Sequence, residues 1–221
     1  MMTPLPDKMR AVVIDKTGDP GVLQYTEDEP LPQPSSSEVL IKNFFAGVNY
    51  IDLYYRSGLY RYAQDFPIIL GQEGVGTIAR TPDPSPYGLK EGDEVIWMHC
   101  GSYAEYSAVP AEYVVTLPSD VPKECAMASY LSGLTALVLV KEIFEIKKGQ
   151  VVLVHAAAGS VGLLLCRLLK HYGARVIGTA STEEKCSLAK ENGADFMVNY
   201  KTKSDWVAEV KNIVSGEPDV V

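Results

Sequence analysis

The pattern of apolar and polar positions divides the chain into two parts with different periods. In roughly the first 120 residues, short β-rich runs are separated by Gly, Pro and Asp, and a helical period is mostly absent. These runs predict strands at residues 10–16, 38–48, 74–80, 92–98 and 104–110. We therefore expect a β-rich N-terminal module.

From residue 123 onward the pattern becomes helical. Residues 124–146 show a long helical pattern of apolar positions, which predicts a helix that ends at Lys147 and Lys148 with Gly149 as its cap. Strands and helices then alternate as βαβαβα, which predicts a parallel sheet with helices packed on its faces. The expected elements, in order from the first strand, are 151–155, 161–173, 175–180, 183–193, 195–200 and 204–216.

This change of pattern predicts two domains, 1–125 and 126–221. The final residues, "PDVV" at 218–221, are typical of the start of another strand. A doubly wound domain is built from two βαβαβ halves, and only the first is present. We interpret the fold as α/β plus β and the sequence as a fragment with an incomplete second domain. An unfinished sheet is expected to expose an apolar edge that favours aggregation.

The segment "HAAAGSVGLLLC" at 155–166 joins the first strand of the second part to its helix. A dinucleotide fingerprint needs small residues here, because the turn is tight, the backbone approaches a pyrophosphate and the helix packs closely on the strand. Ala157, Gly159 and Gly162 occupy the three positions. The helix is expected to open near Val161, where free amides would meet phosphates. We expect Gly159 to tolerate a side chain least. The alternative is that these small residues serve helix–sheet packing alone.

The segment "GTASTEEK" at 178–185 lies where NAD-binding proteins usually carry an Asp or Glu for the ribose hydroxyls. Ser181, Thr182 and Lys185 offer donors and a cation for a 2′-phosphate, which favours NADP. The two glutamates of the segment leave NAD open. Alternatively, Thr182 is only an N-cap and both glutamates compensate the helix dipole.

The formal net charge of −8 is unevenly distributed. Residues 1–125 contain 9 Lys and Arg against 18 Asp and Glu, a net charge of −9, whereas residues 126–221 contain 11 against 10, a net charge of +1. Neither part has the overall basic excess that favours a nucleic-acid partner.

The four cysteines, at positions 100, 125, 166 and 186, have no metal-ligand spacing, and we expect reduced, buried thiols. No N-terminal secretory signal is recognisable. The longest apolar stretch, "SGLTALVLV" at 132–140, is shorter than the roughly 18 residues of a membrane span. We therefore expect a soluble, cytoplasmic protein.

Five segments stand in a characteristic order: "AGVNYIDLYYRSGLY", "LGQEGVGTI", "GDEVIW", "LSGLTA" and "VLVHAAAGSVG". Together they resemble the zinc-independent quinone oxidoreductases of the medium-chain dehydrogenase superfamily, the ζ-crystallin-like group, from about Met9 to Val221. The resemblance implies a GroES-like β domain with the substrate pocket, a Rossmann domain that binds NADPH, and a cleft between them. It also implies that alanine is normal at the first fingerprint position.

The zinc alcohol dehydrogenases carry cysteine where Asn49 stands and histidine where Gln72 stands. They also have a four-cysteine lobe that is absent here. The adjacent His99 and Cys100 offer too few ligands for a metal site. The resemblance therefore implies a site without metal.

By resemblance, four residues of the first part form the catalytic cleft. Asn49 would lie near the nicotinamide and the substrate, and Asp52 would order that turn. Tyr54 and Tyr60 would line the pocket and donate a hydroxyl to a quinone oxygen. From the residues alone, Asn49 could merely satisfy a turn, Asp52 could cap a helix, and the tyrosines could be half-buried loop aromatics.

The resemblance also implies a cofactor site. Thr135 would approach the nicotinamide, although it could simply hydrogen-bond within its own helix. Tyr200 would meet the ribose phosphate, although aromatic residues often end strands. The complete set of expected cofactor-binding residues is Thr135, Ala158, Gly159, Ser160, Val161, Gly162, Ser181, Lys185 and Tyr200.

The predicted function is NADPH-dependent reduction of quinones by hydride or electron transfer, without zinc. Activated alkenes and enones are alternative substrates. Binding of AU-rich RNA is a further alternative, which the acidic first part disfavours. An inactive truncated form is another, because the family continues beyond Val221. The full-length protein is expected to be a homodimer without membrane association.

Overall fold

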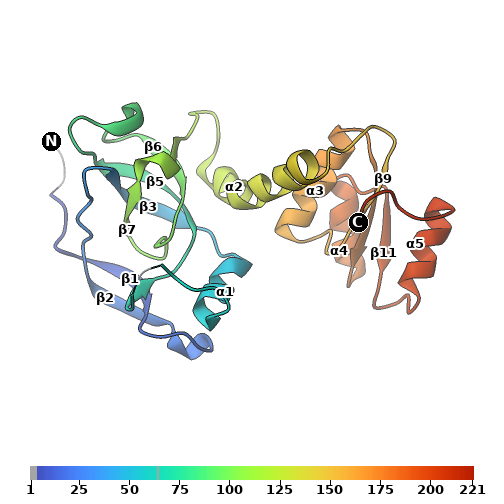
Figure 1. Cartoon of the computed structure of the whole chain (residues 1–221), viewed down its shortest axis with the longest axis horizontal. Coiled ribbons are helices and arrows are strands. Elements are labelled where there is room, and N and C mark those ends of the chain that lie inside the picture. The colour runs from blue at the N-terminus through green and yellow to red at the C-terminus, as the bar shows by residue number, and fades with distance from the viewer. Residues whose placement is uncertain (1–3, 64) are drawn as a thin grey trace. The chain divides into compact units, whose positions relative to one another are not determined.

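The computed structural model describes residues 4–63 and 65–221. The chain forms two compact units, Met1–Tyr130 and Leu131–Val221, which we call unit 1 and unit 2 (Figure 1). Helix α2 (Lys123–Val138) contributes residues to both. The boundary proposed from the sequence, between residues 125 and 126, falls within the first turn of this helix.

Unit 1 contains two antiparallel sheets. The larger has the strand order β7-β3-β5-β6-β8 and the smaller has the order β2-β1-β4. The predicted strands correspond to β1, β3, β5, β6 and β7, whereas the other three strands and helix α1 were not expected. The elements are β1 (Lys8–Ile14), η1 (Pro20–Val22), β2 (Gln24–Pro30), β3 (Glu38–Ala46), α1 (Tyr50–Ser57), β4 (Ile68–Ile69), β5 (Glu73–Arg80), η2 (Pro86–Gly88), β6 (Glu94–Met98), β7 (Tyr106–Pro110), η3 (Ala111–Tyr113) and β8 (Val114–Thr116).

The core of unit 1 lies against the larger sheet. Val39 and Ile41 of β3 are fully buried together with Val95 and Trp97 of β6. Trp97 is paired with Gly74 across the β5–β6 ladder. A Cβ atom on Gly74 would lie 2.7 Å from the indole ring, so packing of the tryptophan requires glycine there.

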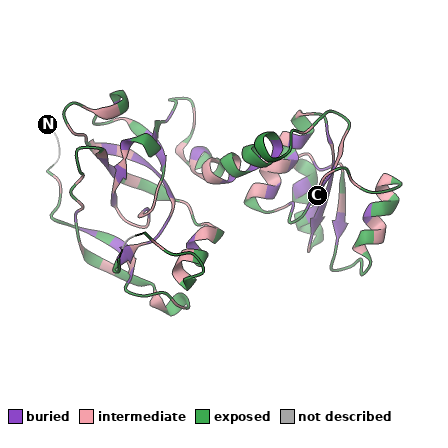
Figure 2. Cartoon of the chain, in the orientation of Figure 1, coloured by how far each residue is buried: buried purple, intermediate pink, exposed green. Residues whose placement is uncertain are grey.

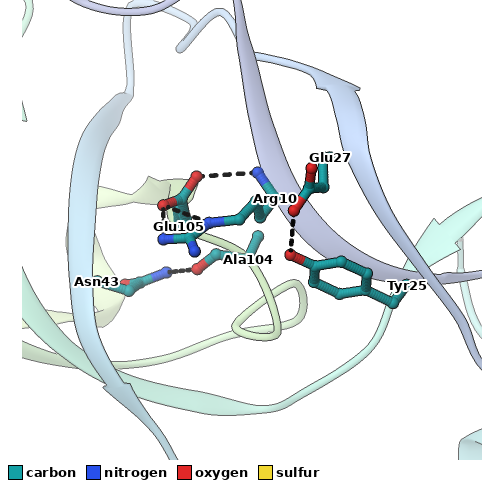
Figure 3. A network of polar contacts seen from close by, with 6 residues as sticks. All are labelled: Arg10, Tyr25, Glu27, Asn43, Ala104 and Glu105. Atoms are coloured by element: carbon teal, nitrogen blue, oxygen red, sulfur yellow. Dashed lines mark hydrogen bonds and ion pairs between the residues drawn. The ribbon is translucent and has the colours of Figure 1, made fainter.

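A polar network joins β1 to the segment before β7 (Figure 3). Glu105 accepts hydrogen bonds from Arg10 at three atoms: Nε at 2.9 Å, Nη2 at 2.5 Å and the backbone N at 2.9 Å. Nearby, Nδ2 of Asn43 donates to the Ala104 carbonyl at 2.9 Å. Hydrogen bonds from the Arg10 side chain hold the pKa of the Glu105 carboxyl below its ordinary value.

The helix that begins with α2 ends earlier than the sequence predicts. After Val138 its backbone forms a π-helical turn, η4 (Leu139–Ile143), and the helix stops at Phe144, which is extended with φ −146° and ψ 111°. Gly149 has φ +88°, but it lies in the turn before strand β9 (Val151–Val154), where its amide donates to the Gly173 carbonyl. The expected continuous helix to Ile146 capped by Gly149 is therefore wrong, because a helical pattern of apolar positions does not reveal where the backbone leaves the helix.

The combined helix Lys123–Ile143 is long and apolar enough, by length and composition, to cross a membrane. The expectation that no stretch reaches that length is therefore wrong. In the structure, Ala126 packs in a core of unit 1 with Val75 and Ile96, and Val140 packs in the main core of unit 2. The helix thus contributes to the core of each unit.

Unit 2 is a parallel sheet in the order β11-β10-β9. Beyond β9, Val220 forms a parallel bridge with Val152 and accepts a hydrogen bond from the Leu153 amide at 2.9 Å. Where the sequence predicts the start of a further strand at 218–221, the structure has an isolated bridge at Val220, beside the first strand of the unit. The elements are β9 (Val151–Val154), α3 (Ser160–His171), β10 (Arg175–Ala180), α4 (Glu183–Glu191), β11 (Phe196–Asn199) and α5 (Trp206–Val214).

Helices cover both faces of this sheet, whose strands are largely buried (Figure 2). Val152 and Val176 pack with Leu169 of α3. Leu153 and Ile177, the next residues of β9 and β10, face the opposite side and pack with α5. This alternation confirms the predicted parallel sheet between helices. Gly173 and Gly193, with φ +76° and +111°, take the left-handed conformation expected after α3 and α4.

All four cysteines are free thiols. Cys166 and Cys186 are buried in unit 2, as expected, and Cys100 is half-buried. Cys125 is exposed, contrary to expectation, whereas its neighbour Ala126 packs in the core of unit 1.

Candidate functional site

The turn after β9 is fastened to the neighbouring strand. The Ala157 amide donates to the Thr179 carbonyl of β10 at 3.0 Å, and the Gly159 amide closes the turn on the Ala156 carbonyl at 2.8 Å. Ala156 has φ +49°, a left-handed conformation that is uncommon for a residue with a side chain. Helix α3 begins at Ser160, one residue before the predicted start.

The two glycines of this turn differ in the space around them. A Cβ atom on Gly162 would lie 2.4 Å from the Ala156 carbonyl oxygen, so no side chain fits. A Cβ atom on Gly159 would lie 3.3 Å from the same oxygen, a contact that a small shift relieves. The expectation that Gly159 is the least tolerant position is therefore wrong for the protein's own packing, because Gly162 is where the helix meets the turn.

The helix N-terminus offers free donors. Leu163 is the first residue whose amide donates back along the helix, to the Gly159 carbonyl at 2.9 Å. In the part of the chain that the structure describes, the backbone amides of Ser160, Val161 and Gly162 donate to no backbone acceptor, as is usual for a first helical turn. Gly159 and Ser160 are exposed and Ala158 is half-buried. Free amides and small exposed residues at the positive end of a helix dipole suit a pyrophosphate.

The predicted ribose-phosphate residues lie at the ends of two adjacent strands. Ser181 directly follows β10, and the Tyr200 amide, directly after β11, donates to the Ala180 carbonyl at 3.1 Å. Lys185 is exposed in the first turn of α4. Thr182 accepts a hydrogen bond from the Lys185 amide at 3.3 Å, so the alternative interpretation of Thr182 as an N-cap is confirmed.

Thr135 lies in α2, among the residues of unit 2. Its hydroxyl donates to the Leu131 carbonyl at 2.8 Å, one turn earlier in its own helix. This is the local alternative considered from the sequence. The role of Thr135 toward a nicotinamide stays a prediction.

In unit 1, Asn49 and Asp52 meet at the start of α1. Asn49 is the N-cap, and its backbone amide donates to Asp52 Oδ2 at 2.7 Å, as in a capping box. Asp52 is buried and also accepts a hydrogen bond from the Tyr103 hydroxyl at 2.8 Å. The Asn49 side chain points elsewhere, because its Nδ2 donates to Glu73 Oε1 at 2.8 Å.

Burial governs the ionisation of this cluster. Desolvation raises the pKa of Asp52, although hydrogen bonds from the Asn49 amide and the Tyr103 hydroxyl oppose the shift. Burial, together with the hydrogen bond to Asp52, also raises the pKa of Tyr103. The phenol therefore stays protonated at neutral pH and acts as the donor.

The tyrosines of α1 and of the following loop form an aromatic cluster. The rings of Tyr54 and Tyr60 have centroids 5.3 Å apart, and Tyr55 lies 4.4 Å from Tyr62 by the same measure. Tyr60, Tyr55, Tyr62 and Phe66 line a cavity of about 710 Å³, which Tyr54 does not line. Among the described residues, neither the Tyr54 nor the Tyr60 hydroxyl has a hydrogen-bond partner, so both hydroxyls are available as donors.

Sequence reasoning missed three residues of these sites. Glu73 holds Asn49, Tyr103 holds Asp52, and Asn199 binds the first residue of α4. Only Glu73 carries a sequence signal, since it is a charged residue opening the otherwise apolar, glycine-rich strand β5. The other two partners depend on tertiary pairing.

The positions of the zinc ligands named above hold amides with other partners. Besides the bond from Asn49 to Glu73, Gln72 Nε2 donates to the Tyr62 hydroxyl at 3.2 Å. Over residues 4–63 and 65–221, no three His, Cys, Asp or Glu side chains gather in an arrangement that could hold a metal ion.

The parallel unit, with a glycine turn between its first strand and the following helix, has the arrangement of a dinucleotide-binding fold, and an antiparallel β unit precedes it. Residues 35–119 match the alcohol dehydrogenase GroES-like domain, and residues 160–221 match the zinc-binding dehydrogenase family. The chain belongs to the medium-chain dehydrogenase/reductase superfamily.

Among curated relatives, the chain is 41% identical over 202 residues to a probable quinone oxidoreductase of Schizosaccharomyces pombe, covering 91% of this chain and 60% of the relative. It is 37% identical over 204 residues to quinone oxidoreductase 1 of Escherichia coli, covering 91% and 61%. The structure of Escherichia coli quinone oxidoreductase complexed with NADPH matches with a TM-score of 0.87 and 36% identity, over 94% of this chain and 63% of that one. The chain thus spans about three fifths of the length of these relatives.

Proposed function

We propose that this chain forms the substrate domain and the first half of the cofactor domain of a zinc-independent reductase that transfers a hydride or electrons from NADPH to a quinone. The turn after β9 carries the proposal, because Gly162 admits no side chain there and the exposed first turn of α3 has free amides. Relatives named quinone oxidoreductase, one of them solved with NADPH, support it.

The cofactor-binding residues have separate roles in this proposal. The backbone of residues 158–162 binds the pyrophosphate, and Ser181, Lys185 and Tyr200 bind the ribose phosphate. Thr135 lies toward the nicotinamide. Bound NADPH supplies the hydride, so the protein has to bind, orient and exclude water.

The acceptor is oriented by groups of unit 1. Asn49 is held by Glu73 and ordered by its capping bond to Asp52, so its amide is fixed before the acceptor binds. Tyr54 and Tyr60 present phenolic hydroxyls to the oxygen of the acceptor. Their rings, and the cavity that Tyr60 lines, suit a flat conjugated molecule. We favour a quinone, and enones are the alternative acceptor class.

The side chains at the positions of the zinc ligands support a reaction without zinc. The amides of Asn49 and Gln72 donate hydrogen bonds at the positions where zinc enzymes place thiolate and imidazole ligands. We further propose that the full-length enzyme is a homodimer in the cytoplasm.

Fluorescence titration of the chain with NADPH and NADH tests the proposal. We expect binding of both, with NADPH tighter. Binding of neither would contradict the proposal, and tighter NADH binding would overturn the choice of cofactor.

NADPH oxidation by the complete open reading frame, with 1,4-benzoquinone or an enone and with or without a zinc chelator, identifies the acceptor. A rate abolished by the chelator would contradict zinc independence.

A further inference from the structure

A buried amide at the end of β11 holds the carboxylate that opens helix α4. Asn199 is 7% exposed, and its Nδ2 donates to Glu183 Oε1 at 2.6 Å. Its Oδ1 accepts from the Lys201 backbone N at 3.0 Å, which fixes the end of the amide that faces the carboxylate. The Asn199 carbonyl also accepts from the amides of Thr202 and Lys203, so the turn carrying the amide is itself ordered.

Glu183 lies in the segment where a carboxylate determines whether a dinucleotide site prefers NAD or NADP. It follows the end of β10 and lies about twenty residues after the glycine turn, where a free carboxylate binds the ribose hydroxyls of NAD. The same charge would repel a 2′-phosphate. Glu183 is exposed, so the bond from Asn199 is what keeps its side chain at the β11 end.

The other charges nearby are also arranged for an anion. Hydrogen bonds from its own backbone amide and from the Thr182 hydroxyl lower the pKa of Glu184 and hold its carboxylate at the helix N-terminus. Lys185 and Lys201 are exposed, and neither has an ion pair in the described part of the chain. Two cations are thus available while both carboxylates are engaged.

We propose that Asn199 is a specificity-determining positioning residue, which favours NADPH over NADH by holding the Glu183 carboxylate away from the ribose pocket. This inference rests on the proposed function, because it places the adenosine ribose of a dinucleotide at Ser181 and Lys185. If Asn199 only capped its own turn, the charge of Glu183 would play no part. Replacing Asn199 would then not change the preference for NADPH over NADH through Glu183.

The test is the ratio of the dissociation constants for NADH and NADPH, measured by fluorescence titration of the 221-residue chain. Asn199→Ala releases Glu183, and we expect the preference for NADPH to fall roughly tenfold. Asn199→Asp keeps the acceptor for Lys201 but replaces the donor with a second carboxylate, so the preference is expected to fall at least as far. Adding Glu183→Ala to Asn199→Ala removes the released charge and is expected to restore the preference.

Asn192→Ala is the matched control. Asn192 is another asparagine of unit 2, at the far end of α4, where its amide donates to the Leu188 carbonyl and accepts from Arg167 Nε. Its removal is expected to leave the ratio unchanged. Circular dichroism shows whether each variant is folded.

The outcomes separate the two proposals. If Asn199→Ala weakens both cofactors equally, or if Glu183→Ala fails to restore the ratio, then Asn199 acts on the fold alone and the inference is wrong. The same holds if Asn199→Ala is unfolded and Asn199→Asp is folded with an unchanged ratio. A wild-type chain that binds neither NADPH nor NADH overturns the proposed function and this inference together.

Discussion

At the scale of single residues, two glycines three positions apart are constrained for different reasons. Gly162→Ala is expected to destabilise unit 2 by about 3 kcal/mol, because its Cβ atom would overlap the Ala156 carbonyl. Gly159→Ala is expected to change stability by less than about 1 kcal/mol but to weaken NADPH binding about tenfold, because the backbone there has to approach a pyrophosphate. Urea unfolding and NADPH titration measure the two effects.

Gly216→Ala is the control for both glycines, since no atom of residues 4–63 and 65–221 outside its own chain neighbours lies within 4 Å of the added Cβ atom. A Gly162→Ala variant as stable as wild type would refute the packing constraint. A Gly159→Ala variant with wild-type NADPH affinity would refute the role of that position in binding.

The sequence shows where these residues lie along the chain, but it does not show which contacts limit the side chain at each position. The pattern around 155–166 places the turn and the helix correctly, because strand, turn and helix are local. It cannot show which glycine meets the Ala156 carbonyl, since that depends on how α3 lies against the turn. In the same way, Asn49 and Asp52 are recognisable as turn and cap residues, but the carboxylate that holds the Asn49 amide comes from β5, 24 positions away.

At the scale of elements, the arginine–carboxylate network of unit 1 links one sheet to another. The pKa of Glu105 is lower in the folded protein than in the unfolded chain, where it is near 4.5. The ionised carboxylate therefore stabilises the fold fully at pH values above 4.5, and this stabilisation is lost as the pH falls through the pKa of the folded state. Glu105→Gln is therefore expected to lower the melting temperature by roughly 2–4 °C at pH 7. Because the wild-type carboxyl is itself protonated in strong acid, the two proteins should converge there.

Thermal unfolding at pH 7 and near pH 2 measures this difference. Glu112→Gln is the matched control, because Glu112 is exposed in η3 and has no ion pair among the described residues. A Glu105→Gln effect that is equally large at both values of pH would show that lost packing, rather than lost charge, is responsible.

The elements that the sequence predicts are those whose burial follows a simple period. The strands β9 and β10 alternate between two helix layers, and all five predicted strands of unit 1 contribute buried side chains. β2 is not apparent from the sequence because its residues, "QYTEDEP", are polar and largely exposed. α1 is hidden because its one buried residue is the carboxylate Asp52. The π-helical turn after α2 cannot be predicted, because the apolar pattern of residues 139–143 is equally typical of an α-helix.

At the scale of the whole molecule, the two units are distinct in composition as well as in contacts. The acidic excess lies in the first 125 residues, and the nearly neutral remainder is the part to which we assign the anionic cofactor. The core of each unit is built largely from its own residues. A ligand bound by unit 2 should therefore act first on the stability of unit 2.

The two tryptophans of the chain allow this to be measured, because Trp97 lies in the core of unit 1 and Trp206 packs on the sheet of unit 2. In Trp97→Phe, fluorescence reports unit 2 alone; in Trp206→Phe, it reports unit 1 alone. NADPH at one hundred times its dissociation constant stabilises a folded binding site by about 2.7 kcal/mol. For a unit of this size, that corresponds to a rise of roughly 10–20 °C in the melting temperature. We expect this rise at Trp206 and a clearly smaller one at Trp97. Equal shifts would show that the two units unfold as one, and a shift confined to Trp97 would place the cofactor in the wrong unit.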